Sequence, residues 1–235
     1  MTFILAIEAS AEACSVALAC GGQRYQRSFS QAKSHSMVIL PMIDALFSEA
    51  GFAPVDLNAI AYDCGPGAFT GLRIGLSFAQ GLAVGWNKPL IAISSLSSLA
   101  QATFKQRPDI FTLVTLLDAR MGEVYVAVYE RNEYSFFASQ PPFICAYQNV
   151  ATQLSHYAGV RSGLVGLGVR EMPDIFKAQF GFVDECMNPD ADALLDLAQL
   201  AWQQGAAIPV EQAELMYLRN SVTWEKHQPR RRREV

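Results

Sequence analysis

The stretch from Asp63 to Gly75, DCGPGAFTGLRIG, contains the residues whose types and spacing come nearest to those of a ligand-binding site. An apolar run precedes it and a helix of small residues follows it. Because glycine lacks a Cβ, such a junction lets a phosphate or another backbone approach closely. The residues that would line the contact are Gly65, Pro66, Gly67, Thr70 and Arg73. Neither the Gly-Lys-Ser/Thr of a Walker loop nor the third glycine of the dinucleotide fingerprint follows. The sequence therefore leaves two alternatives, a ligand site and a tight turn before a glycine-packed helix.

Other catalytic chemistries find less support in the sequence. The three histidines, His35, His156 and His227, lie far apart, and no His-x-x-x-His pair is present to bind a metal from one helical face. The five cysteines have no zinc-motif spacing. Ser36, Ser94 and Ser98 are only weak candidates for a nucleophile, because no base is placed to activate them. We expect no metal site, no cofactor and no catalytic residue.

Composition predicts a folded protein with a sizeable core. The chain has 235 residues, of which 51% are hydrophobic and 17% charged. The net charge of −4 gives no overall attraction to nucleic acid. We expect a cytoplasmic protein with reduced cysteines, because neither a signal peptide nor a membrane-spanning run is evident.

The elements that must position the glycine loop follow an α/β order. Apolar and alternating runs predict strands, a 3.6-residue period predicts helices, and Gly21-Gly22 predicts a hairpin turn. The predicted strands are residues 3–7, 15–20, 23–29, 59–63 and 90–94, and the predicted helices are about 34–50 and 70–86. Three strands followed by helix, strand, helix and strand fit a mixed sheet with helices on its faces.

The pattern then begins again, which indicates an internal duplication. The apolar run ending in Asp118 corresponds to the run ending in Glu8, and each is followed by a turn and a second strand. A strand is predicted at 163–168, and a helix from Asp190, its N-cap, to Gly205, its C′ residue. We expect an N-terminal lobe at residues 1–103 and a C-terminal lobe at 104–225, whose last segment packs back on the first lobe, before a tail at 226–235.

Two helices have features that predict a partner. The helix at 34–50 is apolar on more than one side, so we expect one side to cover the sheet and another to contact a partner. The helix at 70–86 has four glycines, which cost about 4 kcal/mol against alanine unless close packing offsets the loss. The predicted interface residues are Met37, Leu40, Ile43, Phe47, Gly71, Leu72, Gly75 and Ala79. A small-residue ridge packed inside the domain stays open as the alternative.

Several motifs together resemble the bacterial TsaB (YeaZ) family, over nearly the whole chain. They are the glycine signature at 65–75 with AQGLA at 79–83, ILAIE at 4–8, His35-Ser36, DARMGEVY at 118–125 and ELMYLRN at 214–220. The resemblance implies an actin/Hsp70/sugar-kinase (ASKHA) fold. It also implies a non-catalytic scaffold subunit of the complex that makes threonylcarbamoyladenosine in tRNA, beside the anticodon. The implied partners are the catalytic relative TsaD, as a heterodimer, the ATPase TsaE, and tRNA through the complex. A homodimer of the isolated chain is left open.

The resemblance also implies a degenerate nucleotide site, with Glu8 and Asp118 as its remnants. The turn after Glu8 has no glycine and adds Glu12, whose charge would repel a phosphate. The turn after Asp118 has its glycine late, at Gly122. The alternatives are an active ATPase or kinase of the same fold and a peptidase-like enzyme. The chain departs from the family at Asp63-Cys64, where Gly-Arg is common, and at Glu8, where Asp is commoner.

The C-terminal tail is basic, with four consecutive arginines, Arg230, Arg231, Arg232 and Arg233. Its composition predicts a solvated tail. A contact with the tRNA phosphate backbone is the functional alternative.

Overall fold

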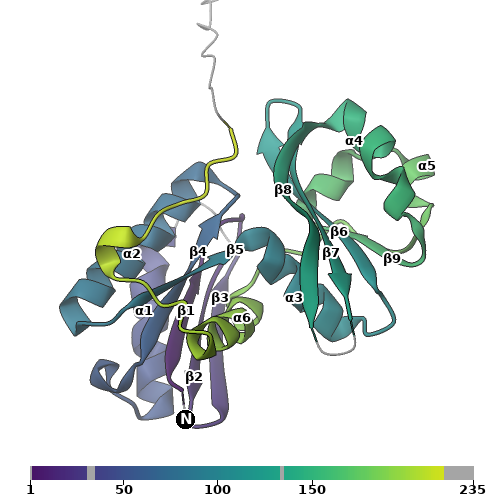
Figure 1. Ribbon diagram of the computed structural model, residues 1–235. Helices are drawn as coiled ribbons and strands as arrows, with labels where there is room; N and C mark the ends of the chain where they lie inside the picture. The colour runs from purple at the N-terminus through teal and green to yellow at the C-terminus, as the bar shows by residue number, and fades with distance from the viewer. Residues whose placement is uncertain (1, 31–34, 133–134, 220–235) are drawn as a thin grey trace, which may run out of the picture.

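The computed structural model describes residues 2–30, 35–132 and 135–219, which form two α/β lobes side by side (Figure 1). Each lobe is built on a five-stranded mixed sheet, with strand orders β3-β2-β1-β4-β5 and β8-β7-β6-β9-β10. Both orders place an antiparallel three-stranded meander beside two parallel strands. The identical order confirms the predicted α/β fold of two similar lobes from an internal duplication.

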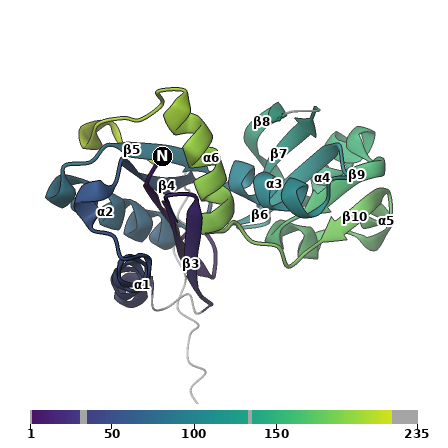
Figure 2. The same ribbon diagram turned by 90° about the horizontal axis from the view of Figure 1, so that it is seen from below.

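The first lobe follows the predicted element order closely. Its strands are β1 (Ile4–Glu8), β2 (Cys14–Cys20), β3 (Gln23–Phe29), β4 (Ala59–Gly65) and β5 (Leu90–Ser94), and its helices are α1 (His35–Ala50) and α2 (Phe69–Trp86). Helices α1 and α2 cover one face of the sheet, and α6 (Ala191–Gln203) covers the opposite face (Figure 2). The predicted strands and helices of this lobe are thereby confirmed to within a few residues.

The second lobe contains more elements than the sequence predicted. Its strands are β6 (Thr112–Arg120), β7 (Glu123–Arg131), β8 (Phe136–Ala146), β9 (Gly159–Val165) and β10 (Phe180–Asp184). Its helices are α4 (Tyr147–Leu154) and α5 (Asp174–Lys177), with short 3₁₀ turns at Ser155–Tyr157 and Leu167–Glu171. Similar turns at Pro54–Asp56 and Val210–Gln212 belong to the first lobe. The short α4 and α5 were not predicted because neither provides two full periods of apolar residues.

Helix α3 (Ser95–Gln106) is the main element that the sequence did not predict. It lies between the lobes, where Leu96, Leu99 and Phe104 pack into the core of the second lobe. Its N-terminal half is rich in serine, which weakens the apolar pattern of a helix. Helix α3 also runs across the predicted boundary between residues 103 and 104, and that boundary stays a prediction.

The last helix and the segment after it belong spatially to the first lobe. Asp190 caps α6 by accepting a hydrogen bond from the Ala193 amide, and Gly205 follows the helix with a φ of 73°, as predicted. The chain then runs along the first sheet, where Ile208 exchanges backbone hydrogen bonds with Leu90. The segment from Glu214 to Arg219 continues past the end of β4 toward the second lobe (Figure 1).

The alternation of side chains along the central strands explains why the first lobe has a hydrophobic core on each face of its sheet. In β1, Leu5 and Ile7 pack with α1 and α2, whereas Ile4 and Ala6 pack with α6. Because successive side chains of a strand point to opposite faces, Glu8 extends to the face that α6 covers. The same alternation in β4 sends Asp63 to that face.

Candidate functional site

The glycine loop packs against the backbone of the turn that follows β1. The Ala68 amide donates to the Ser10 carbonyl oxygen at 2.7 Å. A Cβ added at Gly67 would lie 2.6 Å from the same oxygen, and one added at Gly71 would lie 2.0 Å from the Ala9 carbonyl oxygen. The space that glycine leaves free is therefore occupied by this chain's own backbone. Of the two alternatives that the sequence left open, this geometry favours the glycine-packed turn.

Two carboxylates meet beneath this loop, at the carboxyl ends of β1 and β4. Parallel pairing ends at Ile7 opposite Tyr62, so the next residues, Glu8 and Asp63, are neighbours on the same face of the sheet. Glu8 is fully buried and Asp63 is 3% exposed. A buried carboxylate pair was not anticipated, since the two residues are 55 positions apart and the sequence linked Glu8 only with Asp118.

In each of the two carboxyl groups, one oxygen accepts two hydrogen bonds and the other, within the described part of the chain, accepts none. Oε1 of Glu8 accepts from the Ser10 amide at 2.7 Å and from the Ser10 hydroxyl at 2.6 Å. Oδ1 of Asp63 accepts from the Gly65 amide and the Ser95 hydroxyl, both at 2.6 Å. Oε2 of Glu8 and Oδ2 of Asp63 are buried and, among the described residues, have no donor.

Burial controls the protonation of this site. The pKa of Glu8 is raised well above its usual value, first by burial and then by the charge of Asp63. Burial, and then the nearby carboxylates, raise the pKa of the Cys14 thiol to about 11 and that of the Cys64 thiol to about 12. Both thiols therefore stay protonated at neutral pH and are poor nucleophiles.

The second carboxylate turn has the same local geometry as the first and a different environment. Oδ1 of Asp118 accepts from the Arg120 amide at 2.8 Å, two residues on, as Glu8 accepts from Ser10. The Asp118 carboxylate is partly exposed and pairs with the Arg120 guanidinium at 3.0 Å. At both turns one carboxylate oxygen accepts from the backbone amide two residues on, as predicted, whereas the second oxygen of Glu8 has no donor among the described residues.

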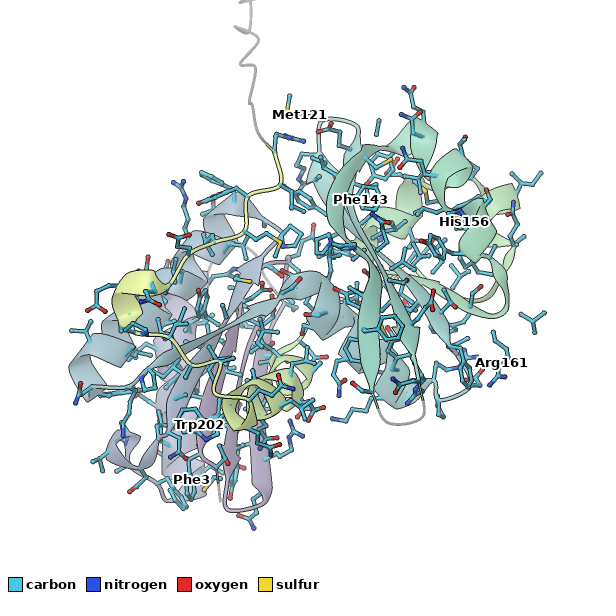
Figure 3. All side chains as sticks on the ribbon, in the orientation of Figure 1. Phe3, Met121, Phe143, His156, Arg161 and Trp202 are labelled. Carbon is cyan, nitrogen blue, oxygen red and sulfur yellow. The ribbon has the colours of Figure 1, made fainter. Side chains whose placement is uncertain are left out.

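The C-terminal segment joins the two lobes beside these turns. The Met216 amide donates to the Cys64 carbonyl oxygen at 2.7 Å, at the end of β4. Three residues later, the Arg219 guanidinium donates to the Ala119 carbonyl oxygen at 3.1 Å and pairs with the Glu123 carboxylate. Figure 3 shows Met121 at the tip of the β6–β7 hairpin, next to the end of this segment.

Most residues of the predicted interface on α1 and α2 are buried within this chain, and the interface itself stays a prediction. Six of the eight fill the packing between the helices and the rest of the first lobe; they are Ile43, Phe47, Gly71, Leu72, Gly75 and Ala79. Helix α1 buries the line from Ile39 through Ile43 to Leu46 and Phe47 against the sheet. Only Met37 and Leu40, exposed by 75% and 41%, face outward.

The outward face of α2 includes Thr70 and Arg73, which the sequence analysis assigned to the glycine loop. Phe69 is 58% exposed and Val84 69%, and Thr70 and Arg73 are exposed with them. The Arg73 guanidinium stacks 3.8 Å from the centroid of the Phe69 ring. Tyr217, 57% exposed, lies next to both, with its ring centroid 6.5 Å from that of Phe69. The ELMYLRN motif at 214–220 was the one signal that could have placed Tyr217 here.

Hollows lie on both sides of Arg73. One, of about 420 Å³, is lined by the first residues of α1 and α2, including Ser36, Phe69 and Ile74. The other, of about 470 Å³, lies between α2 and the C-terminal segment, against Glu214 and Tyr217. Both are open and shallow, which is typical of a surface that receives a side chain rather than of an enclosed ligand site.

In the part of the chain that the structure describes, no three His, Cys, Asp or Glu side chains are grouped closely enough to hold a metal ion. None of the described helices is both long enough and apolar enough to cross a membrane. The predicted tRNA contacts at Arg230 to Arg233 lie outside the described residues.

Comparisons with known proteins agree with one another. A family model described as "TsaD: tRNA N6-adenosine threonylcarbamoyltransferase" matches residues 28–153. The chain is 36% identical over 226 residues to the Escherichia coli (strain K12) protein named "tRNA threonylcarbamoyladenosine biosynthesis protein TsaB", covering 95% of this chain and 97% of that one. A protein of the same name from Haemophilus influenzae is 35% identical over 231 residues, covering 95% and 96%. The solved structure of YeaZ from Pseudomonas aeruginosa superposes with a TM-score of 0.83 at 33% identity, covering 93% of this chain and 100% of that chain.

Proposed function

The chain belongs to the TsaB (YeaZ) family of tRNA threonylcarbamoyladenosine biosynthesis proteins, and we propose that it is the non-catalytic scaffold of the modifying complex. In this role it binds and supports the catalytic subunit TsaD and helps to recruit the ATPase TsaE. The complex transfers a threonylcarbamoyl group to the adenosine beside the anticodon of tRNA. Family membership supports the assignment to this reaction. The exposed surface of α1 and α2 supports the scaffold role.

We propose the outward face of α1 and α2 as the TsaD contact. It comprises Met37 and Leu40 of α1 with Thr70, Arg73 and Val84 of α2. Large apolar side chains exposed together on adjacent helices are typical of a surface that another protein covers. This face keeps the helices of the original prediction and replaces the buried ridge with residues that a partner can reach.

The Phe69–Arg73–Tyr217 cluster is the proposed centre of that contact. Aromatic and arginine side chains are enriched among the residues that dominate binding energies, and here stacking already orders them. The hollows on either side of Arg73 would receive side chains of the partner. The cluster also joins α2 to the C-terminal segment, so the contact would involve two parts of the sequence.

The absence of catalysis in this chain is part of the proposal. Its support is that the Ala9–Ser10 backbone occupies the space over the glycine loop and that the Glu8 carboxylate is enclosed. A phosphate could approach the loop amides only after that turn had moved. An ATPase, a kinase or a peptidase-like enzyme would each need an open site with an accessible catalytic group.

Binding to purified TsaD tests the scaffold role. Met37→Asp and Arg73→Glu should each weaken the complex by about 100-fold, because an unpaired carboxylate buried at an interface costs several kcal/mol. Both positions are exposed in the isolated chain, so both variants should fold, which circular dichroism checks. Val160→Asp is the matched control, since Val160 is an 89% exposed apolar residue of β9 in the other lobe.

Unchanged TsaD affinity in both helix variants would remove the contact from this face. Loss of affinity in the Val160→Asp control as well would show that the effect is not specific to α1 and α2. Size-exclusion chromatography of the isolated variants reports in addition whether a homodimer uses the same face.

A further inference from the structure

We propose that Glu8 and Asp63 share one proton at neutral pH, with the protonated Oε2 of Glu8 donating a hydrogen bond to the ionised Oδ2 of Asp63. The two carboxyl groups lie within hydrogen-bonding reach of each other, on adjacent strands and on one face of the sheet. The two oxygens without a donor then become donor and acceptor for one another. No other described group supplies a proton to either oxygen.

The arrangement of donors assigns the proton to Glu8. Asp63 lies at the N-terminus of α3, where the hydroxyl of Ser95, the first residue of that helix, donates to it. A helix N-terminus stabilises a negative charge, so in the shared-proton arrangement the single negative charge of the pair lies on Asp63. Glu8 is fully buried and has no such helix end, and its raised pKa has burial as its largest cause.

The groups around the pair provide no positive charge that could replace the proton. Cys14 of β2 and Cys64 of β4 are neutral thiols at neutral pH. His35 of α1 lies against the same turn, but its Nε2 contacts the Glu12 carbonyl oxygen at 3.1 Å. Asp190, at the start of α6, is a further acid, whose pKa burial raises. Two ionised carboxylates would therefore repel each other in a site from which water is excluded.

A proton fits this site better than a metal ion. Mg²⁺ held by one or two carboxylates completes its six oxygen ligands with water or phosphate, whereas both free oxygens of this pair are buried away from solvent. The neighbouring serine hydroxyls already donate to the other two oxygens. The shared proton leaves a single net charge, which the Gly65 amide and the start of α3 stabilise.

The proton links the stability of the glycine loop to pH. Because the folded pKa of Glu8 is raised, the stabilisation is complete below the unfolded pKa and is lost as the pH rises through the folded pKa. Between these two values, the folding equilibrium constant falls about tenfold per pH unit. Loss of the proton would also strain the Ser10 turn, whose carbonyl oxygen accepts from the Ala68 amide.

Amide substitutions test the proposal because an amide carries its own donor. In Glu8→Gln, the amide oxygen still accepts from Ser10 and the amide nitrogen donates to Asp63 without a titrating proton. We expect this variant to fold at least as stably as the wild type at pH 7 and to lose the fall in stability that the wild type shows as the pH rises from the unfolded toward the folded pKa of Glu8. Asp63→Asn should be tolerated less well, because its amide donor leaves the negative charge on the buried Glu8, away from the N-terminus of α3.

The double variant Glu8→Gln/Asp63→Asn sets two amide donors against each other. It should be destabilised by about tenfold or more beyond the combined effects of the single variants. Glu8→Ala is the disruptive control, since it removes the acceptor of the Ser10 amide and hydroxyl and the proposed partner of Oδ2 of Asp63. Urea unfolding of each variant between pH 6 and 9 measures these effects.

Three outcomes would overturn the proposal. The first is a Glu8→Gln variant as unstable as Glu8→Ala, with the wild-type pH slope retained. The second is a wild-type melting temperature that falls with EDTA and is restored by Mg²⁺, which would identify a metal ion in place of the proton. The third is an ionised Glu8 at pH 7 in the carbon-13 spectrum of the labelled wild-type carboxyl groups, a readout that does not depend on any variant folding.

Discussion

The packing of Gly71 against the turn after β1 gives a prediction whose magnitude follows from the structure. An alanine Cβ at this position would lie 2.0 Å from the Ala9 carbonyl oxygen, whereas real Cβ contacts under 3.0 Å essentially never occur. The turn and α2 would have to separate by about 1 Å, and the hydrogen bond from Ala68 to Ser10 would lengthen with them. Overpacking of this kind costs about 1–3 kcal/mol, and a weakened hydrogen bond adds up to about 1 kcal/mol.

The matched control is the same substitution ten residues further along the same helix. A Cβ at Gly81 meets nothing within 4 Å, so Gly81→Ala should stabilise the protein by about 0.5–1 kcal/mol through helix propensity. Gly71→Ala should instead destabilise it by about 1–3 kcal/mol. The two identical substitutions should therefore differ by roughly 1 M in their urea midpoints.

Equal stability of the two alanine variants would refute this reasoning, because it would mean that the glycine loop does not approach the Ala9–Ser10 backbone in solution. A stable Gly71→Ala protein that bound nucleotide would refute it more strongly, since it would show an open loop. An added Cβ at Gly75 would lie 3.4 Å from the Ala9 side chain, which is an ordinary van der Waals contact, so only a side chain larger than alanine would overpack this position.

Two further predictions follow from the proposed scaffold role. Calorimetry of the isolated chain with Mg-ATP should detect no binding tighter than about millimolar, near −4 kcal/mol, because the loop amides face this chain's own backbone; a micromolar dissociation constant with turnover would contradict the scaffold proposal. Deleting residues 229–235 should flatten the salt dependence of tRNA binding by the assembled complex and leave TsaD binding unchanged, because counterion release accompanies arginine–phosphate contacts. An identical salt slope with and without these residues would identify a solvated tail.

Much of the fold was predictable because its signals are local. Alternating and apolar runs located the strands of the first lobe, and the repeated strand ending in a carboxylate revealed the duplication at Glu8 and Asp118. The hydrogen bond from each of these carboxylates to the amide two residues on is equally local. Helix α3 was missed, since its apolar residues pack in the second lobe while Ser95 donates to Asp63 in the first.

The sequence by itself determined the family, the two-lobed α/β order, and the helices and loop on which function depends. Tertiary structure alone decided which side of each helix is buried, since α1 is apolar around most of its circumference and its pattern fits more than one orientation. It also decided that Gly67 and Gly71 receive the backbone of Ser10 and Ala9, and that Glu8 lies beside Asp63. Both contacts join segments more than 50 residues apart through parallel strand pairing, and no local periodicity encodes which strands become neighbours.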